Sequence, residues 1–113
     1  MAQEASRIKL TYQDLAHFPE DGQRHELVDG EHFVTASPST RHQQIVTNLL
    51  LYLATYVKKQ KTGRVFPAPC DVLFSRFDVV EPDLLVVLRP SNEIITDANI
   101  QGSPDLVVEE VQE

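Results

Sequence analysis

The stretch PDLLVV at residues 82–87 returns in a varied form as PDLVVEE at residues 104–110. In both, a Pro-Asp pair is followed by branched apolar residues, which is typical of a strand buried on both faces. The second run closes with two further acids, Glu109 and Glu110. The two phrases are too short to form a true internal repeat. We interpret them as two strands with acids at their ends.

The acids of these strands admit two interpretations. Side chains alternate along a strand, so Asp105 and Glu109 share a face of the second strand. In one interpretation the carboxylates only mark strand ends and accept local backbone hydrogen bonds, which we favour for Asp105. In the other, the strands are neighbours, Asp83 approaches Glu109, and a divalent cation such as Mg²⁺ relieves the repulsion between them. Such a cation lowers the pKa of a bound water and stabilises charge developing on phosphorus.

Residues 37–63 carry the clearest helical pattern in the chain. Apolar side chains recur at spacings of three and four, at Ile45, Val46, Leu49, Leu50, Leu53, Tyr56 and Val57. This is the amphipathic stripe of a helix of about five turns. Ser37, Ser39 or Thr40 can cap its start, and Gly63 is the expected stop at its end.

The other segments predict short elements. Thr11 is a plausible cap of a short helix, and Asp29-Gly30 is a strong signal for a hairpin turn. Pro67 and Pro69 place the strand that contains them at a sheet edge or bulge. The expected order is a short helix at 10–19, a hairpin at 25–37, the long helix, one or two strands at 64–74, and strands at 79–88 and 104–113. This order indicates an α/β (α+β) fold in which one long helix packs on a mixed sheet.

Composition indicates one globular domain of residues 1–113. The chain is 42% apolar, has a net charge of −7, and contains a single cysteine, Cys70. No apolar run is long enough to span a membrane, and the N-terminus lacks the apolar core of a secretory signal. These features favour a cytoplasmic setting and argue against a nonspecific nucleic-acid coat.

Charge is distributed unevenly along the chain. Residues 32–70 contain no acid but five basic residues, Arg41, Lys58, Lys59, Lys61 and Arg64. Residues 71–113 contain ten acids and two basic residues. A positive segment beside an acidic one suits a metal-dependent phosphodiesterase, in which bases hold phosphates and carboxylates hold the cation. The alternative is a solvated basic helix end, which the helix dipole favours in any case.

Five quoted stretches carry a resemblance to a known family. They are LTYQDLAHFPEDGQRHELVDGE, ASPSTRHQQIVTNL, PAPCDVLFS, VVEPDLLVV and ITDANIQGSPDLVVEE, in the family's order and over nearly all of residues 10–109. On these stretches the chain resembles the Uma-type family, which belongs to the PD-(D/E)XK restriction-endonuclease-like superfamily. The resemblance implies a restriction-endonuclease-like core and a metal-dependent endonuclease activity on DNA.

The resemblance also implies roles for four residues. Asp83 matches the aspartate of the family's Pro-Asp motif, and Glu109 matches the acid of its second motif, so both are expected to bind Mg²⁺ or Mn²⁺. Glu26 matches a glutamate of the N-terminal hairpin, and His42 matches a helix histidine that orients substrate or water. A lone helix histidine is also often a buried structural residue, so both interpretations remain open for His42.

The chain departs from the family after its second motif. The superfamily has a lysine two residues after the second acid or on a later helix, but this chain has Val111 there and no lysine after Lys61. We therefore expect a core that lacks the last helix and strand, with impaired cleavage. The alternative is a catalytically inactive, self-associating module. The sheet region left uncovered near the C-terminus of such a module predicts a homo-oligomer.

Overall fold

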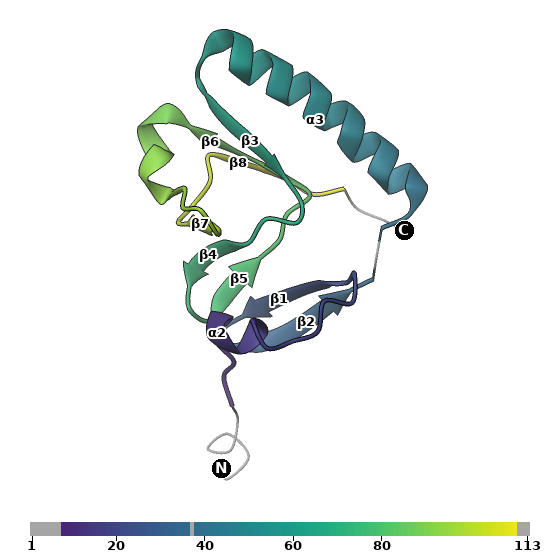
Figure 1. Ribbon diagram of the computed structural model, residues 1–113, viewed down its shortest axis with the longest axis vertical. Helices are drawn as coiled ribbons and strands as arrows, with labels where there is room; N and C mark the ends of the chain where they lie inside the picture. Colours follow the sequence, from purple (N-terminus) through teal and green to yellow (C-terminus); the bar gives the residue numbers. More distant parts are fainter. Residues whose placement is uncertain (1–7, 37, 111–113) are drawn as a thin grey trace.

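A computed structural model describes residues 8–36 and 38–110 of the chain. It contains one long helix, several short elements and two β-sheets (Figure 1). The long helix α3 lies against β3 on one side of a three-stranded sheet, and a five-stranded sheet extends away from it. This mixed α+β arrangement agrees with the fold class predicted from the sequence.

The five-stranded sheet contains the predicted hairpin. Its strand order is β2-β1-β5-β4-β7, formed by β1 (Arg24–Val28), β2 (Glu31–Thr35), β5 (Asp78–Val80), β4 (Val72–Ser75) and β7 (Ile100–Gln101). The hairpin turns at Asp29 and Gly30, which both have positive φ, 50° and 78°. A Cβ on Gly30 would lie 2.5 Å from Cβ of Lys9, so this position requires glycine for space as well as for conformation. β7 is parallel to β4 and the other pairs are antiparallel, so the sheet is mixed.

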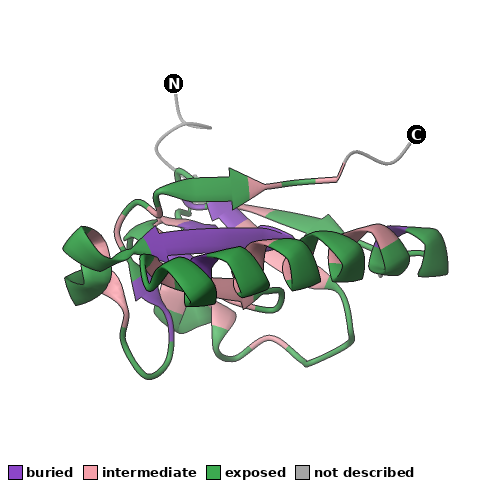
Figure 2. Ribbon diagram, turned by 90° about the horizontal axis from the view of Figure 1, so that it is seen from above, coloured by how far each residue is buried: buried purple, intermediate pink, exposed green. Residues whose placement is uncertain are grey.

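The three-stranded sheet holds both of the repeated phrases. β6 (Leu84–Leu88) lies between β3 (Gly63–Pro67) and β8 (Leu106–Val108), and both pairings are antiparallel. The predicted edge position of the strand containing Pro67 is confirmed. The four residues 84–87 are all buried, as expected for a central strand (Figure 2).

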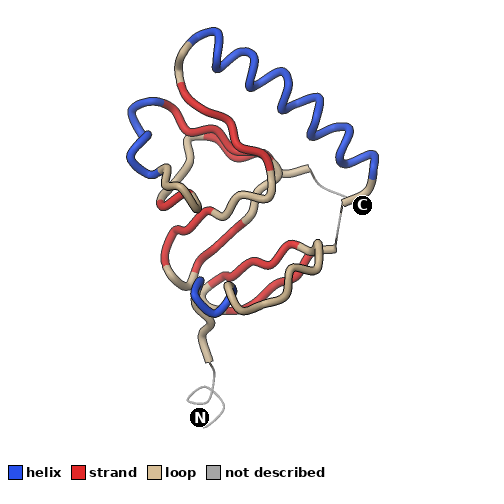
Figure 3. The backbone as a smooth tube through the Cα atoms, viewed as in Figure 1, coloured by secondary structure: helices blue, strands red, loops and turns tan. Residues whose placement is uncertain are grey.

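The prediction of one continuous strand at 79–88 is wrong. The segment forms two strands, β5 and β6, which belong to different sheets and are joined by residues 81–83 (Figure 3). Pro82 lies in this link, and its missing N–H cannot contribute to a strand ladder. The break turns the chain between the two sheets and leaves Asp83 at the entrance of β6.

The long helix α3 (Thr40–Gln60) begins as predicted and ends earlier than predicted. Ser39 caps it by accepting a hydrogen bond from the His42 amide at 3.1 Å. Lys61, with φ 56°, forms the left-handed C-terminal cap that we expected from Gly63. Gly63 instead begins β3, where a Cβ would lie 2.3 Å from the carbonyl oxygen of Val87. The glycine is thus needed for close strand packing, and the helix ends without it.

The core is small and lies between the two sheets. Its buried centre consists of Val72, Leu85, Val87 and Ile100. The short helix α2 (Tyr12–Leu15), capped by Thr11 as predicted, and the 3-10 helix η1 (Arg89–Ile94) complete the described elements.

The α3 helix contributes little to this core. Only two of its described side chains are buried, and most of its surface is exposed (Figure 2). The predicted amphipathic stripe is therefore present in the sequence but only partly covered.

Asp105 has the structural role that we favoured. Its Oδ2 accepts a hydrogen bond from the Leu88 amide at 2.7 Å, and its Oδ1 lies 3.4 Å from Oγ of Ser91. This carboxylate therefore joins the end of β6 to the segment before β8, and the other acids of the two phrases must be considered separately.

Candidate functional site

Asp83 lies at the point where β6 and β8 meet the hairpin. In the antiparallel register Leu84 pairs with Val108, which places Asp83 beside the segment that contains Glu109 and Glu110. The predicted neighbourhood of the two acid-bearing strands is therefore confirmed. Asp83 is only 2% exposed, so its charge depends on partners from the protein.

Three donors hold the buried carboxylate of Asp83. Its Oδ1 accepts a hydrogen bond from Nη2 of Arg24 at 2.6 Å, and the same oxygen lies 3.0 Å from Nε2 of His42. Its Oδ2 accepts a hydrogen bond from the Glu110 amide at 2.7 Å. Burial alone would raise the pKa of Asp83, but the Glu110 amide, the guanidinium and the imidazole outweigh it and lower this pKa below its usual value. Asp83 is thus an anion at neutral pH.

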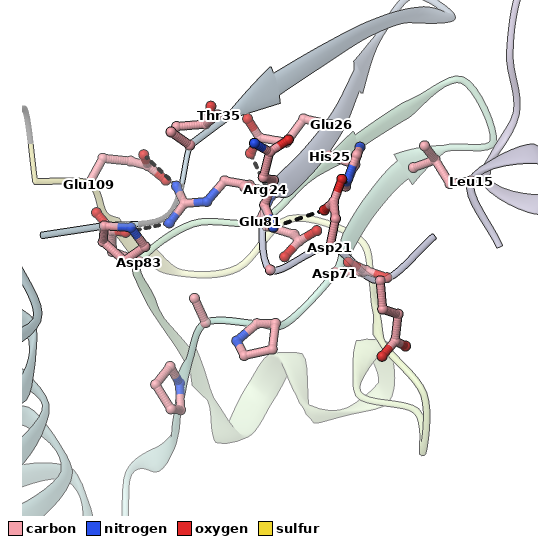
Figure 4. Close-up of a pocket in the computed structure, with 18 of the residues that line it drawn as sticks. Leu15, Asp21, Arg24, His25, Glu26, Thr35, Asp71, Glu81, Asp83 and Glu109 are labelled. Carbon is pink, nitrogen blue, oxygen red and sulfur yellow. Dashed lines mark hydrogen bonds and ion pairs between the residues drawn. The ribbon is translucent and has the colours of Figure 1, made fainter. Parts of the chain in front are cut away.

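Arg24 reaches this site from β1 and contacts both predicted acids (Figure 4). Besides its contact with Asp83, its Nη1 lies 3.4 Å from Oε2 of Glu109. Burial alone would lower the pKa of Arg24, but the two carboxylates raise it above its usual range. The guanidinium is therefore a permanent positive charge between the two acids.

Glu109 and Glu26 complete the acidic wall of one open pocket, which Arg24 and Asp83 also line. Burial, Asp83 and Glu26 raise the pKa of Glu109, while Arg24 acts in the opposite direction. Oε2 of Glu26 accepts a hydrogen bond from the Glu81 amide at 2.7 Å, which fixes the hairpin against the link between β5 and β6.

His42 is both buried and part of the site. It lies in the first turn of α3, where Nε2 contacts Asp83 and Nδ1 contacts Oε1 of Glu110. Because carboxylate oxygens only accept, each contact is a hydrogen bond when a proton lies on that ring nitrogen. The two interpretations of His42 are therefore compatible in geometry, because a buried histidine here also fixes the orientation of Asp83.

A second group of polar residues lines the same pocket at Tyr12, Asp71 and Glu81, and Asn99 lies beside it. Burial, and then the neighbouring carboxylate of Asp71, raise the pKa of Glu81 from 4.5 to about 7. Tyr12 donates a hydrogen bond to Oδ2 of Asp71 at 2.9 Å, and Nδ2 of Asn99 lies 3.4 Å from the tyrosine oxygen. Sequence patterns gave no signal for this group, because its members come from four separate segments of the chain.

Comparison with known proteins gives a family for the chain. A model of the Uma2 family, described as "Putative restriction endonuclease", matches residues 11–111. The chain belongs to the Uma2 family. This result confirms the family resemblance seen in the sequence.

Among solved structures, the chain is similar to a crystal structure described as a "putative nuclease" from Anabaena variabilis. The TM-score is 0.73 and the sequence identity 20%, over 91% of this chain and 59% of the other. This similarity shows a shared fold, and the chain spans less than two thirds of the length of the protein it matches. No protein with a curated description matches the chain significantly.

Restriction-endonuclease-like proteins generally use divalent metal ions, and the site of this Uma2-family chain contains some of the donors that such an ion needs. Asp83 and Glu109 offer the hard oxygen ligands that Mg²⁺ prefers. In the described arrangement, however, Arg24 engages both carboxylates, and both oxygens of Asp83 already have partners. Within residues 8–36 and 38–110, no three His, Cys, Asp or Glu side chains are placed to hold one ion. The donor set therefore does not fit a metal while the guanidinium remains between the acids.

The sequence contains one signal for Arg24. Arg24 and Glu26 are two residues apart on β1, so the arginine lies on the same face of the hairpin as the predicted Glu26. No pattern indicated that the same face would meet Asp83, which is 59 residues away.

The length and apolar character of the helices bear on whether the chain contains a membrane-spanning helix. Within the described part of the chain, no helix combines the length and the apolar character needed to cross a membrane.

Proposed function

We propose that this Uma2-family chain carries the acidic centre of a DNA endonuclease, which acts on phosphodiester bonds. Asp83 and Glu109 are the proposed ligands for Mg²⁺ or Mn²⁺, with Glu26 and His42 beside them. One observation supports this proposal above the others: acids from two neighbouring antiparallel strands converge on a single cationic group. We place the protein in the cytoplasm, with its one cysteine, Cys70, as a free thiol.

The charge of the pocket argues for an added cation when DNA binds. Asp83, Glu109 and Glu26 line the pocket, and Arg24 supplies compensating positive charge. A DNA phosphate that enters this pocket is repelled by the carboxylates unless further positive charge accompanies it. The divalent metals that this class of proteins generally uses would supply such charge and polarise the scissile phosphate.

A second candidate is a catalytically inactive module that self-associates. Apolar side chains are exposed on α3 and on the edge strand β8, where Tyr52 is 71% and Leu106 46% exposed. An exposed apolar helix face and an edge strand both favour association with a second copy. The homo-oligomer that we expect from the sequence belongs to this proposal.

Supercoiled plasmid DNA incubated with Mg²⁺ or Mn²⁺ distinguishes the two candidates. We compare the wild-type protein with Asp83→Asn and with the matched control Asp97→Asn, which makes the same change at an exposed position. We expect nicking by the wild type and the control, and a loss of at least about 100-fold in Asp83→Asn, as for removal of a group that stabilises a transition state.

Two results would contradict the nuclease proposal. Cleavage that persists in purified Asp83→Asn would come from a contaminant or from another site. The absence of metal-dependent cleavage in the wild type, together with a dimer in sedimentation velocity, would favour the inactive module. Far-UV circular dichroism of each variant confirms that it is folded.

A further inference from the structure

Arg24 occupies the place between Asp83 and Glu109 that a bound cation would take. Its Nη2 is 2.6 Å from Oδ1 of Asp83, and its Nη1 is 3.4 Å from Oε2 of Glu109. One guanidinium therefore joins the two carboxylates that are the proposed metal ligands.

We propose that Arg24 is the resident counter-ion of this carboxylate pair and competes with a divalent cation for it. The inference rests on the function proposed above, because it names how that same site is kept closed to metal. In the described state the arginine holds the acids together, and a cation binds only when the guanidinium moves away.

The charges and the contacts both support competition. A guanidinium and a divalent cation on the same two carboxylates repel each other strongly, because little water separates them. In the described state Oδ1 of Asp83 already meets Arg24 and His42, and Oδ2, which accepts from the Glu110 amide, keeps one further acceptor position. Of these partners, the Glu110 amide belongs to the backbone and the His42 side chain is only 7% exposed, so the more exposed and longer arginine side chain is the one that leaves most easily.

The pocket provides a route for the exchange. The Arg24 side chain is 18% exposed and that of Glu109 is 51% exposed, so solvent ions reach both from the pocket. His42 and the Glu110 amide hold Asp83 in place when the arginine departs. Glu26, on the same wall, offers the displaced guanidinium another carboxylate within the pocket.

A metal titration of stability tests the competition without DNA. We follow the melting temperature against Mn²⁺ and Mg²⁺ concentration for the wild type, for Arg24→Gln, and for Arg64→Gln. The last variant removes the same charge from an exposed position on β3. A cation that binds only the folded state raises the melting temperature by mass action.

If Arg24 competes with the cation, Arg24→Gln melts below the wild type without metal and regains the difference when metal is added. We expect its midpoint at a metal concentration about tenfold lower than that of the wild type, a preference typical of coupling between two sites. Arg64→Gln should titrate like the wild type. Adding Asp83→Asn to Arg24→Gln should abolish the response to metal.

Three results would overturn the inference: an unchanged or higher midpoint in Arg24→Gln, a melting loss that metal does not restore, or no response to metal in any variant. If Arg24→Gln does not fold, an NMR titration of the wild-type protein with Mg²⁺ tests the competition. Mg²⁺ must then shift the side-chain Nε–H resonance of Arg24 in a saturable way, and an unmoved resonance contradicts competition. Because neither experiment contains DNA, a failure of plasmid cleavage tests the proposed function separately.

Discussion

Replacing Glu81 with glutamine should remove a pH-dependent loss of stability. Glu81 lies in the link between β5 and β6, where burial and then Asp71 raise its pKa from 4.5 to about 7. The folded protein therefore keeps a proton on Glu81 at pH values at which the unfolded chain has released it. By linkage, its contribution to the free energy of unfolding is largest below 4.5, falls as the pH rises to about 7, and is level above that.

The size of this loss follows from the two pKa values. Each pH unit between them corresponds to about 1.36 kcal/mol, so the interval from 4.5 to about 7 sets an upper limit of about 3 kcal/mol. Glu81 is only partly buried, so water screens part of this energy. We expect the wild type to lose about 1–2 kcal/mol of stability between about pH 5 and about pH 8 through this group.

Urea denaturation at several pH values provides the assay. Glu81→Gln carries no titrating group at this position, so it should match the wild type near pH 5 and exceed it by about 1–2 kcal/mol near pH 8. Glu93→Gln, which makes the same change at an exposed position of η1, is the matched control. Its difference from the wild type should vary little with pH.

One outcome would refute the reasoning about Glu81. If the difference in unfolding free energy between Glu81→Gln and the wild type is the same at both ends of the pH range, the folded state does not hold that proton. The raised pKa, and the close approach of Asp71 that contributes to it, would then be wrong.

Two further substitutions test the supports of the site. His42→Ala removes the imidazole that contacts Asp83 and Glu110. We expect this change to lower the free energy of unfolding, measured by urea denaturation, by about 2–3 kcal/mol. A loss below about 1 kcal/mol would show that these contacts contribute little. Ser39→Ala removes the N-terminal cap of α3 and should lower the free energy of unfolding by about 1 kcal/mol, which corresponds to a melting temperature about 4 °C lower. An unchanged melting temperature would show that the Ser39 cap does not stabilise the helix.

Local patterns in the sequence determined most of the elements. The hairpin follows from Asp29-Gly30, because few residue pairs adopt two successive positive φ values at low energy. The long helix follows from apolar spacing and from a serine able to cap it. These signals depend only on residues close together in the sequence, so the hairpin and the long helix can be predicted without the tertiary structure.

The end of the helix and the break at residues 81–83 depended on more distant contacts. Gly63 is glycine because Val87 of another strand approaches it closely, so the residue signals strand packing and not a helix end. In the stretch from 79 to 88, apolar residues lie on both sides of Glu81, Pro82 and Asp83. Pro82 allows a break there, but only the pairing of the two halves with different sheets shows that they are separate strands. A periodic pattern records which residues are buried but not which strands bury them.

The sequence by itself identified Asp83 and Glu109 as acids at the ends of two strands that could be neighbours. Only the tertiary structure decided what lies between them. Arg24 comes from a hairpin 59 residues before Asp83, and its side chain meets both acids because β1, β6 and β8 converge at one pocket. The physical reason is that a local pattern fixes the face on which a charge lies, whereas the packing of separate segments fixes which opposite charge it meets.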